Sequence, residues 1–119
     1  MKKSKIYCID IDGTICNNTY GAYAKAEPML DRIEKINHLY NEGNTIVYYT
    51  ARGMSSFGGD QAKVYEKFYD FTKRQLELWG CKYHELKLGK LSYDYWIDDK
   101  AERDSEFFDD SYCGIRRTK

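Results

Sequence analysis

The sequence predicts an α/β fold, a single domain of three layers with a mostly parallel sheet between helices. Short apolar runs alternate with longer segments of helical periodicity, in the order strand, helix, strand, helix, strand. The apolar runs are nearly continuous, as in strands covered on both faces. The chain has 119 residues, of which 42% are hydrophobic and 32% charged. This size and composition indicate one folded domain, spanning residues 1–119, rather than a disordered segment.

The first half of the chain contains a predicted strand, a helix and a second strand. Residues 5–11 (KIYCIDI) are rich in β-branched and aromatic residues, which indicates a buried strand. A polar, turn-rich segment over residues 13–27 follows. Pro28 is then well placed to begin a helix that Gly43 ends. The almost wholly apolar residues 44–50 (NTIVYYT) predict the second strand.

The second half predicts one helix and two further strands. A loop over residues 51–60 (ARGMSSFGGD) leads to a helix expected at residues 61–79, with Asp60 as its N-cap. Residues 83–88 (YHELKL) and 93–98 (YDYWID) are predicted to form the third and fourth strands.

Polar residues stand at the C-terminal ends of three predicted strands: Asp10 and Asp12, Thr50, and Asp98 and Asp99. In parallel sheets, ligands bind outside these ends. Residues two apart in an extended chain point to the same side, so the two carboxylates of the first strand can reach one small site. Two carboxylates about 4 Å apart repel by roughly 4 kcal/mol at an effective dielectric of about 20. We therefore expect a divalent cation, and an all-oxygen site favours Mg²⁺.

A site of this composition suits phosphoryl transfer. Mg²⁺ lets an anionic phosphate approach an anionic nucleophile. One carboxylate can attack phosphorus and become an aspartyl phosphate, while its neighbour protonates the leaving alcohol. The Thr50 hydroxyl and a lysine can stabilise the phosphoryl oxygens. Hydrolysis of phosphate monoesters needs up to ~10²¹-fold acceleration, which calls for several charged groups around one centre.

Four motifs carry a family resemblance. The segments DIDGT (10–14), YYTARG (48–53), GK (89–90) and WIDDKA (96–101) resemble, in order, the signature motifs of the haloacid dehalogenase superfamily. The resemblance spans residues 6–101. It is closest to the small phosphatases associated with capsule and other surface-polysaccharide biosynthesis, and it implies a Rossmann-like fold.

The resemblance implies a role for each motif residue. Asp10 is expected to be the nucleophile and Asp12 the general acid/base. Thr50 is expected to bind the phosphoryl group, and Lys90 to stabilise both that group and the nucleophile. The cofactor implied is Mg²⁺. Its expected ligands are Asp10, Asp12 through its main-chain carbonyl, Asp98 as the main additional ligand, and Asp99.

Two further residues of the second motif, Ala51 and Arg52, are candidates for substrate binding beside Thr50 and Lys90. A solvated loop arginine is an equally good interpretation of Arg52. The pair Asp98-Asp99 also has a structural alternative, in which its side chains cap the helical turn that follows.

The spacing of the motifs predicts that the enzyme has no cap domain. Larger members of the superfamily carry a cap inserted after the first motif or between the second and the third. Here each of these intervals accommodates one helix and its connections. We therefore expect an open site, with residues 15–27 as a flap and the 51–60 loop as a lid.

Composition excludes several classes of protein. Lys plus Arg and Asp plus Glu both number 19, so the chain lacks the basic character of a dedicated nucleic-acid binder. The basic N-terminus is not followed by the apolar run of a signal peptide, and no apolar stretch approaches the ~20 residues of a membrane span. A cytoplasmic protein with four free cysteines is expected, with no membrane partner.

The expected function is Mg²⁺-dependent hydrolysis of a small phosphomonoester, with a phosphorylated sugar as the favoured substrate. A phosphotransferase of the same chemistry is the nearest alternative. A receiver-like signalling module usually pairs adjacent acids on its first strand, whereas Asp10 and Asp12 flank Ile11. A non-catalytic phosphate- or metal-binding module and a homo-oligomer both stay open from the sequence.

Overall fold

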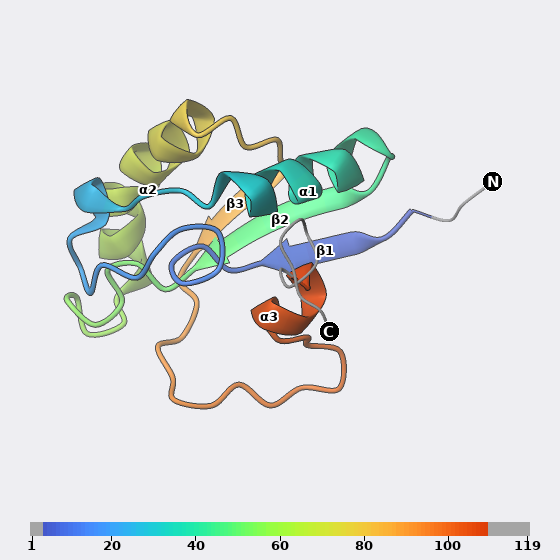
Figure 1. The fold of residues 1–119 in the computed structure, drawn as a ribbon. Helices are drawn as coiled ribbons and strands as arrows, with labels where there is room; N and C mark the ends of the chain where they lie inside the picture. Colours follow the sequence, from blue (N-terminus) through green and yellow to red (C-terminus); the bar gives the residue numbers. More distant parts are fainter. Residues whose placement is uncertain (1–3, 110–119) are drawn as a thin grey trace.

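The computed structural model describes residues 4–109. Within them, three strands form one parallel sheet in the order β1-β2-β3, and helices pack beside it (Figure 1). The predicted α/β class is therefore confirmed. The elements are β1 (Ile6–Ile9), the short helix η1 (Tyr23–Lys25), α1 (Leu30–Asn41), β2 (Thr45–Thr50), α2 (Gln61–Leu78), β3 (Glu85–Leu88) and α3 (Asp104–Phe108).

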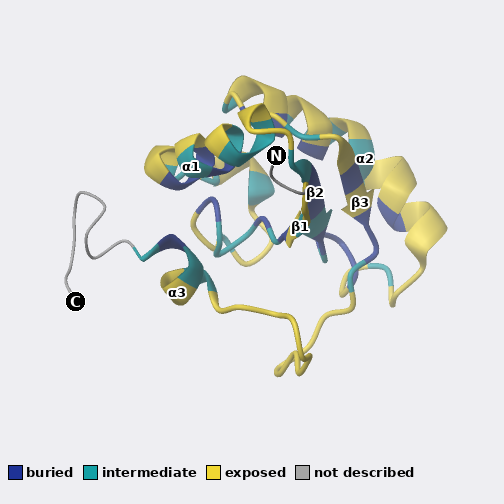
Figure 2. Cartoon of the chain, turned by 90° about the vertical axis from the view of Figure 1, so that its right-hand side faces the viewer, coloured by how far each residue is buried: buried dark blue, intermediate teal, exposed yellow. Residues whose placement is uncertain are grey.

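Helices α1 and α2 cover the same face of the sheet. Each connects one strand to its next neighbour in the same direction, and right-handed crossovers then place both helices on one side (Figure 2). Alternate residues of β3 show this one-sided burial, because Leu86 and Leu88 are buried whereas Glu85 and Lys87 are exposed. The core therefore lies between the sheet and these two helices.

Local signals set the helix ends. The Asp60 side chain accepts a hydrogen bond from the Lys63 backbone N–H (3.3 Å), which confirms it as the N-cap of α2. Helix α1 begins at Leu30, so Pro28 stands before its N-cap Met29 and not at the expected first helical position. Gly43 follows the C-cap of α1, as expected. Among residues 4–109, no helix combines the length and the apolar character needed to cross a membrane.

Helix α3 was not predicted, and it packs next to β1. The Phe107 ring lies 5.9 Å from the Tyr7 ring of β1, measured between centroids. Phe108 is buried, and the Arg32 guanidinium lies 4.6 Å from its ring centroid. Arg32 also donates to Asp104 (2.8 Å), so this arginine of α1 attaches both ends of the short helix.

The predicted fourth strand over residues 93–98 is wrong. These residues are irregular and exposed, and Ile97 keeps 93% of its surface accessible. The Lys90 ammonium lies over the Tyr93 ring (5.1 Å) and the Trp96 ring (5.3 Å). Residues three apart in a strand point to opposite faces, so an extended conformation does not favour both contacts. Residues 93–98 therefore form an irregular segment in which both rings contact Lys90, and not a strand.

A tyrosine occupies the free edge of the sheet at its C-terminal end. The Leu88 backbone N–H of β3 donates to the Tyr65 hydroxyl (3.0 Å), which in turn donates to the Leu88 carbonyl (3.2 Å). Tyr65 belongs to α2. One side chain therefore satisfies both outward-facing backbone groups of the last residue of β3.

We expect Gly53→Ala to destabilise the protein by about 2 kcal/mol or more, because φ is +80° there and a Cβ would lie 2.6 Å from the Phe68 ring. Gly58→Ala is the matched control, since its φ is +59° and no atom lies within 4 Å of the new Cβ. It should cost only about 1 kcal/mol. Urea denaturation measures both changes, and equal losses would contradict the close contact with Phe68.

Candidate functional site

The C-terminal ends of all three strands meet at one edge of the sheet. Asp10 follows β1, Thr50 ends β2, and Lys90 follows β3 after one glycine. The Lys90 Nζ lies 3.6 Å from Asp10 Oδ1, and the Lys90 backbone N–H donates to the Thr50 carbonyl (3.1 Å). The structure therefore brings Asp10, Thr50 and Lys90 together, whereas the expected contribution of Asp98 and Asp99 from a fourth strand is not seen.

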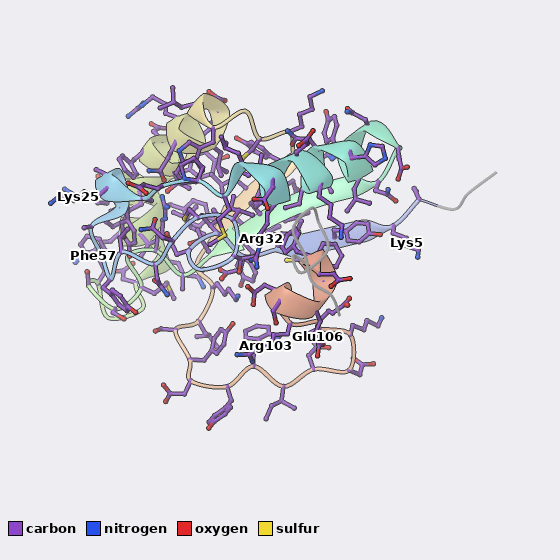
Figure 3. The ribbon with its side chains drawn as sticks, in the orientation of Figure 1. Lys5, Lys25, Arg32, Phe57, Arg103 and Glu106 are labelled. Carbon is purple, nitrogen blue, oxygen red and sulfur yellow. The ribbon has the colours of Figure 1, made fainter. Side chains whose placement is uncertain are left out.

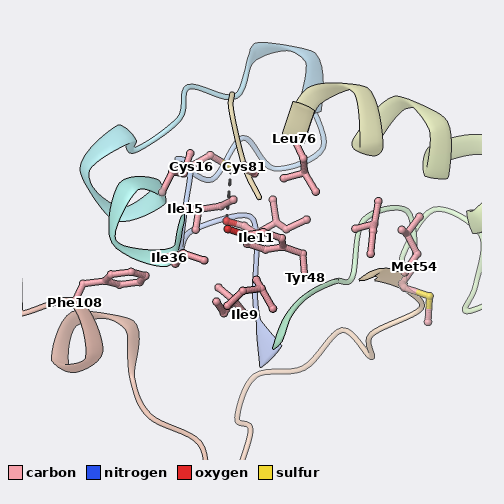
Figure 4. Packing of buried hydrophobic residues seen from close by; sticks show 14 of the residues in the cluster. Ile9, Ile11, Ile15, Cys16, Ile36, Tyr48, Met54, Leu76, Cys81 and Phe108 are labelled. Carbon is pink, nitrogen blue, oxygen red and sulfur yellow. Dashed lines mark hydrogen bonds between the residues drawn. The ribbon is translucent and has the colours of Figure 1, made fainter. Parts of the chain in front are cut away.

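A tight turn fixes the two aspartates after β1. Ile11 is fully buried in the core between them, close to Tyr48 (Figure 4). The Ile11 carbonyl accepts hydrogen bonds from the backbone N–H groups of Thr14 (3.0 Å) and Ile15 (2.9 Å). The buried isoleucine thus anchors the turn, and its polar neighbours Asp10 and Asp12 stay partly accessible.

The Asp10 carboxyl sits in a mixed electrostatic environment. Burial raises its pKa above the ordinary value, and the Asp12 charge adds to the rise. Lys90 and a hydrogen bond donated by the Thr14 hydroxyl to Asp10 Oδ2 (3.3 Å) oppose the rise without cancelling it. Asp10 is therefore a carboxylate held at some energetic cost in a partly desolvated position.

The Lys90 side chain stays protonated beside Asp10. Burial by itself lowers the pKa of the Lys90 ammonium, but the Asp10 carboxylate and Tyr93 together raise it above its ordinary value. The Lys90 ammonium therefore stays charged beside Asp10 at this edge of the sheet.

Arg52 is buried, so the expectation of a solvated loop arginine is wrong. Its Nε and Nη2 donate to the two Asp12 oxygens at 2.9 and 3.0 Å. Its Nη1 donates to Thr72 Oγ1 (3.3 Å), and the Tyr23 ring centroid lies 4.7 Å from the guanidinium carbon. The guanidinium binds Asp12 rather than facing solvent, which gives no support to its expected contact with substrate.

Thr50 and Ala51 lie beside this arginine. Thr50 is buried, and its hydroxyl oxygen accepts a hydrogen bond from the Arg52 backbone N–H (3.2 Å). Ala51 is partly buried and packs against the core.

Asp98 and Asp99 are not brought together with the other acids. Both are exposed, and Asp98 Oδ1 accepts a hydrogen bond from the Lys100 backbone N–H (2.8 Å). This bond lowers the pKa of Asp98. Within residues 4–109, no three acidic, histidine or cysteine side chains gather closely enough to hold a metal ion. The arrangement favours the alternative in which Asp98 caps a local turn.

The 51–60 loop packs against the core and α2, which gives no support to its expected role as a lid. Met54 is buried in the core, and the Phe57 ring lies 6.3 Å from the Phe68 ring of α2 (Figure 3). The Tyr23 hydroxyl of the expected flap accepts a hydrogen bond from the Gly53 backbone N–H (3.1 Å). The two segments are therefore packed together, and no sequence signal had singled out Tyr23.

Comparisons with known proteins support a family relationship. No protein-family model matches the chain, and no curated protein matches it. The crystal structure of a structural-genomics target from Vibrio cholerae matches with 31% sequence identity and a TM-score of 0.81, covering 87% of this chain and 87% of that one. The chain belongs to the same family as this protein. The name of the Vibrio protein states no activity, so the relationship extends to fold and descent.

We expect Thr14→Val to raise the pKa of Asp10 further, because the lost hydroxyl donor favours the charged carboxylate. A ¹³C NMR titration of the Asp10 carboxyl carbon measures the change. Thr45→Val, at the opposite end of β2 from Thr50, is the control, and it should leave the pKa of Asp10 unchanged. An unchanged or lowered pKa in Thr14→Val would show that the hydroxyl does not act on Asp10.

Proposed function

We propose that the protein is a phosphomonoester hydrolase that works through an aspartyl phosphate on Asp10. The observation that carries the proposal is the placement of Asp10 3.6 Å from the Lys90 ammonium, with Asp12 beside it on the same turn. A nucleophile, a fixed cation and a second carboxyl group thus share one partly accessible edge of the sheet. The motif resemblance to haloacid dehalogenase phosphatases supports the same chemistry.

The chain's own groups support a two-step reaction. In the first step an Asp10 oxygen attacks phosphorus, the bond from phosphorus to the leaving alcohol breaks, and protonated Asp12 gives its proton to the departing oxygen. In the second step water attacks the phosphoryl group and gives a proton to Asp12. The acyl phosphate bond breaks, and Asp10 and inorganic phosphate are released. Lys90 and the Thr50 hydroxyl stabilise the phosphoryl oxygens.

Mg²⁺ is proposed as the cofactor, with the Asp10 carboxylate and the Asp12 main-chain carbonyl as its protein ligands, because the Asp12 carboxyl oxygens are bound by Arg52. Mg²⁺ is commonly bound through one or two carboxylates plus substrate phosphate and water, so these oxygen donors fit its chemistry. Asp98 and Asp99 do not fit, because the structure leaves both exposed and outside any metal-binding cluster. When bound, the cation offsets the repulsion between the phosphate and the Asp10 carboxylate.

We expect chelation to abolish release of inorganic phosphate from p-nitrophenyl phosphate and added Mg²⁺ to restore it. Asp10→Asn should lower turnover by at least about 10³-fold at every Mg²⁺ concentration, because the nucleophile is lost. Phosphate release is followed by a colorimetric assay. Full activity of thoroughly demetallated protein would exclude the cofactor. Normal turnover of Asp10→Asn, with deamidation excluded, would exclude the nucleophile.

The aromatic pair Tyr93 and Trp96 supports a ring-bearing substrate such as a sugar phosphate. The two ring centroids lie 5.0 Å apart, and each residue keeps nearly half of its surface exposed. Both rings contact the Lys90 ammonium, which also faces Asp10. A phosphoryl group held by Lys90 would bring its leaving group close to these aromatic faces, and such faces bind the apolar side of a sugar ring.

We expect Trp96→Ala to raise KM about tenfold more for a hexose phosphate than for glycerol phosphate, because only the hexose covers the ring face. Steady-state kinetics on both substrates measure the ratio. Tyr95→Ala removes an aromatic ring that is 85% exposed and has no described contact with Lys90, so it serves as the matched control. Equal KM changes for both substrates would mean that Trp96 acts only through Lys90.

A further inference from the structure

The contacts of Arg52 assign it a role that substrate binding does not explain. We propose that Arg52 is a positioning residue, which holds the Asp12 carboxyl group in the orientation needed for proton transfer. The inference rests on the proposed function, because it concerns the proton donor of that reaction. It concerns the proton that Asp12 gives to the leaving alcohol, rather than the attack by Asp10.

The geometry of the Arg52–Asp12 pair restricts rotation of the carboxyl group. Two different guanidinium nitrogens donate to two different oxygens, at 2.9 and 3.0 Å. Parallel bonds of this kind define the plane of a carboxylate as well as its distance. Arg52 is wholly buried, whereas the Asp12 side chain keeps 17% exposure. The pair therefore fixes Asp12 from the protein side and leaves part of it accessible from the solvent side.

Arg52 is itself held at both ends. The third guanidinium nitrogen donates to the Thr72 hydroxyl of α2 (3.3 Å), and the Tyr23 ring covers the guanidinium plane. At the other end, the backbone N–H of Arg52 donates to the Thr50 hydroxyl oxygen (3.2 Å). A side chain restrained by this many partners has little freedom, and it transfers that restraint to Asp12.

The same contacts argue against direct substrate binding by Arg52. All three guanidinium nitrogens have protein partners, and the side chain has no exposed surface. A substrate phosphate would have to displace Asp12 or Tyr23 to reach it. An effect of Arg52 on catalysis should therefore pass through Asp12, and this is measurable as an interaction between two substitutions.

The test compares Arg52→Lys, Asp12→Asn and the double variant on p-nitrophenyl phosphate and on an alkyl phosphate. Lysine keeps the charge but cannot bind both oxygens in one plane. We expect Arg52→Lys to lower kcat for the alkyl phosphate at least about tenfold more than for p-nitrophenyl phosphate, whose leaving group needs little protonation. KM should change little. In the Asp12→Asn background, Arg52→Lys should cause no further loss.

Arg32→Lys is the matched control. Arg32 is also a buried arginine, and it pairs with a carboxylate of Asp104 (2.8 Å) and with the Phe108 ring (4.6 Å). It also donates to the Thr14 carbonyl (2.9 Å), on the Asp10 side of the turn after β1, and not to Asp12. Any loss in this variant should be equal for both substrates. Equal losses of kcat on both substrates in Arg52→Lys, or additive losses of kcat in the double variant, would overturn the proposal. Arg52 would then only stabilise the fold.

A measurement without activity keeps the inference separate from the proposed function. If the wild-type protein releases no phosphate from either substrate, the proposed function is wrong. The Arg52 Nε–H signal in NMR should nevertheless exchange slowly with water in the wild type and faster in Asp12→Asn. Rapid exchange in the wild type, or the same rate in both proteins, would overturn the positioning role even if Arg52→Lys failed to fold.

Discussion

The guanidinium of Arg52 joins four parts of the chain that are distant in sequence. Arg52 itself follows the end of β2. Its guanidinium binds Asp12 in the turn after β1, contacts Thr72 of α2, and lies against the Tyr23 ring in the segment before α1. A buried charge costs several kcal/mol unless it is paired and hydrogen-bonded. The arrangement of these four segments therefore depends on completing this set of contacts, and Asp12 is the charged member that neutralises it.

Much of the fold followed from local sequence signals. The apolar runs that became β1, β2 and β3 are short and bounded by glycine or polar residues, and Asp60 is a strong N-cap. Each of these signals depends on residues only a few positions apart, so it is visible in the sequence without knowledge of the tertiary contacts. The approach of Asp10 and Thr50 to one edge followed in turn, because parallel strands deliver their C-terminal ends there. Lys90 was assigned to the site by the motif resemblance, and the structure places it beside Asp10.

The parts that sequence reasoning missed depend on which partner each side chain finds in the folded chain. Arg52 resembles any loop arginine until Asp12, 40 residues away, is placed against it. Residues 93–98 have the composition of a strand, but composition does not supply a neighbouring strand, and Lys90 instead attracts two of their aromatic rings. The Asp98 side chain likewise met the nearest donor, a backbone N–H two residues on. A distant partner therefore decided the placement of Arg52, whereas partners close in sequence decided the placement of residues 93–98 and of Asp98.

The Tyr65 hydroxyl at the edge of β3 has a consequence for the behaviour of the protein at high concentration. An edge strand with unpaired N–H and C=O groups is a template on which strands of other molecules can add, and this is a route to aggregation. Tyr65 takes both groups of Leu88, at the point where the strand reaches the candidate site. The backbone groups of Leu88 are therefore not free to pair with a strand of a second molecule. The end of the sheet that carries the candidate site can stay accessible to ligands without inviting strand addition there.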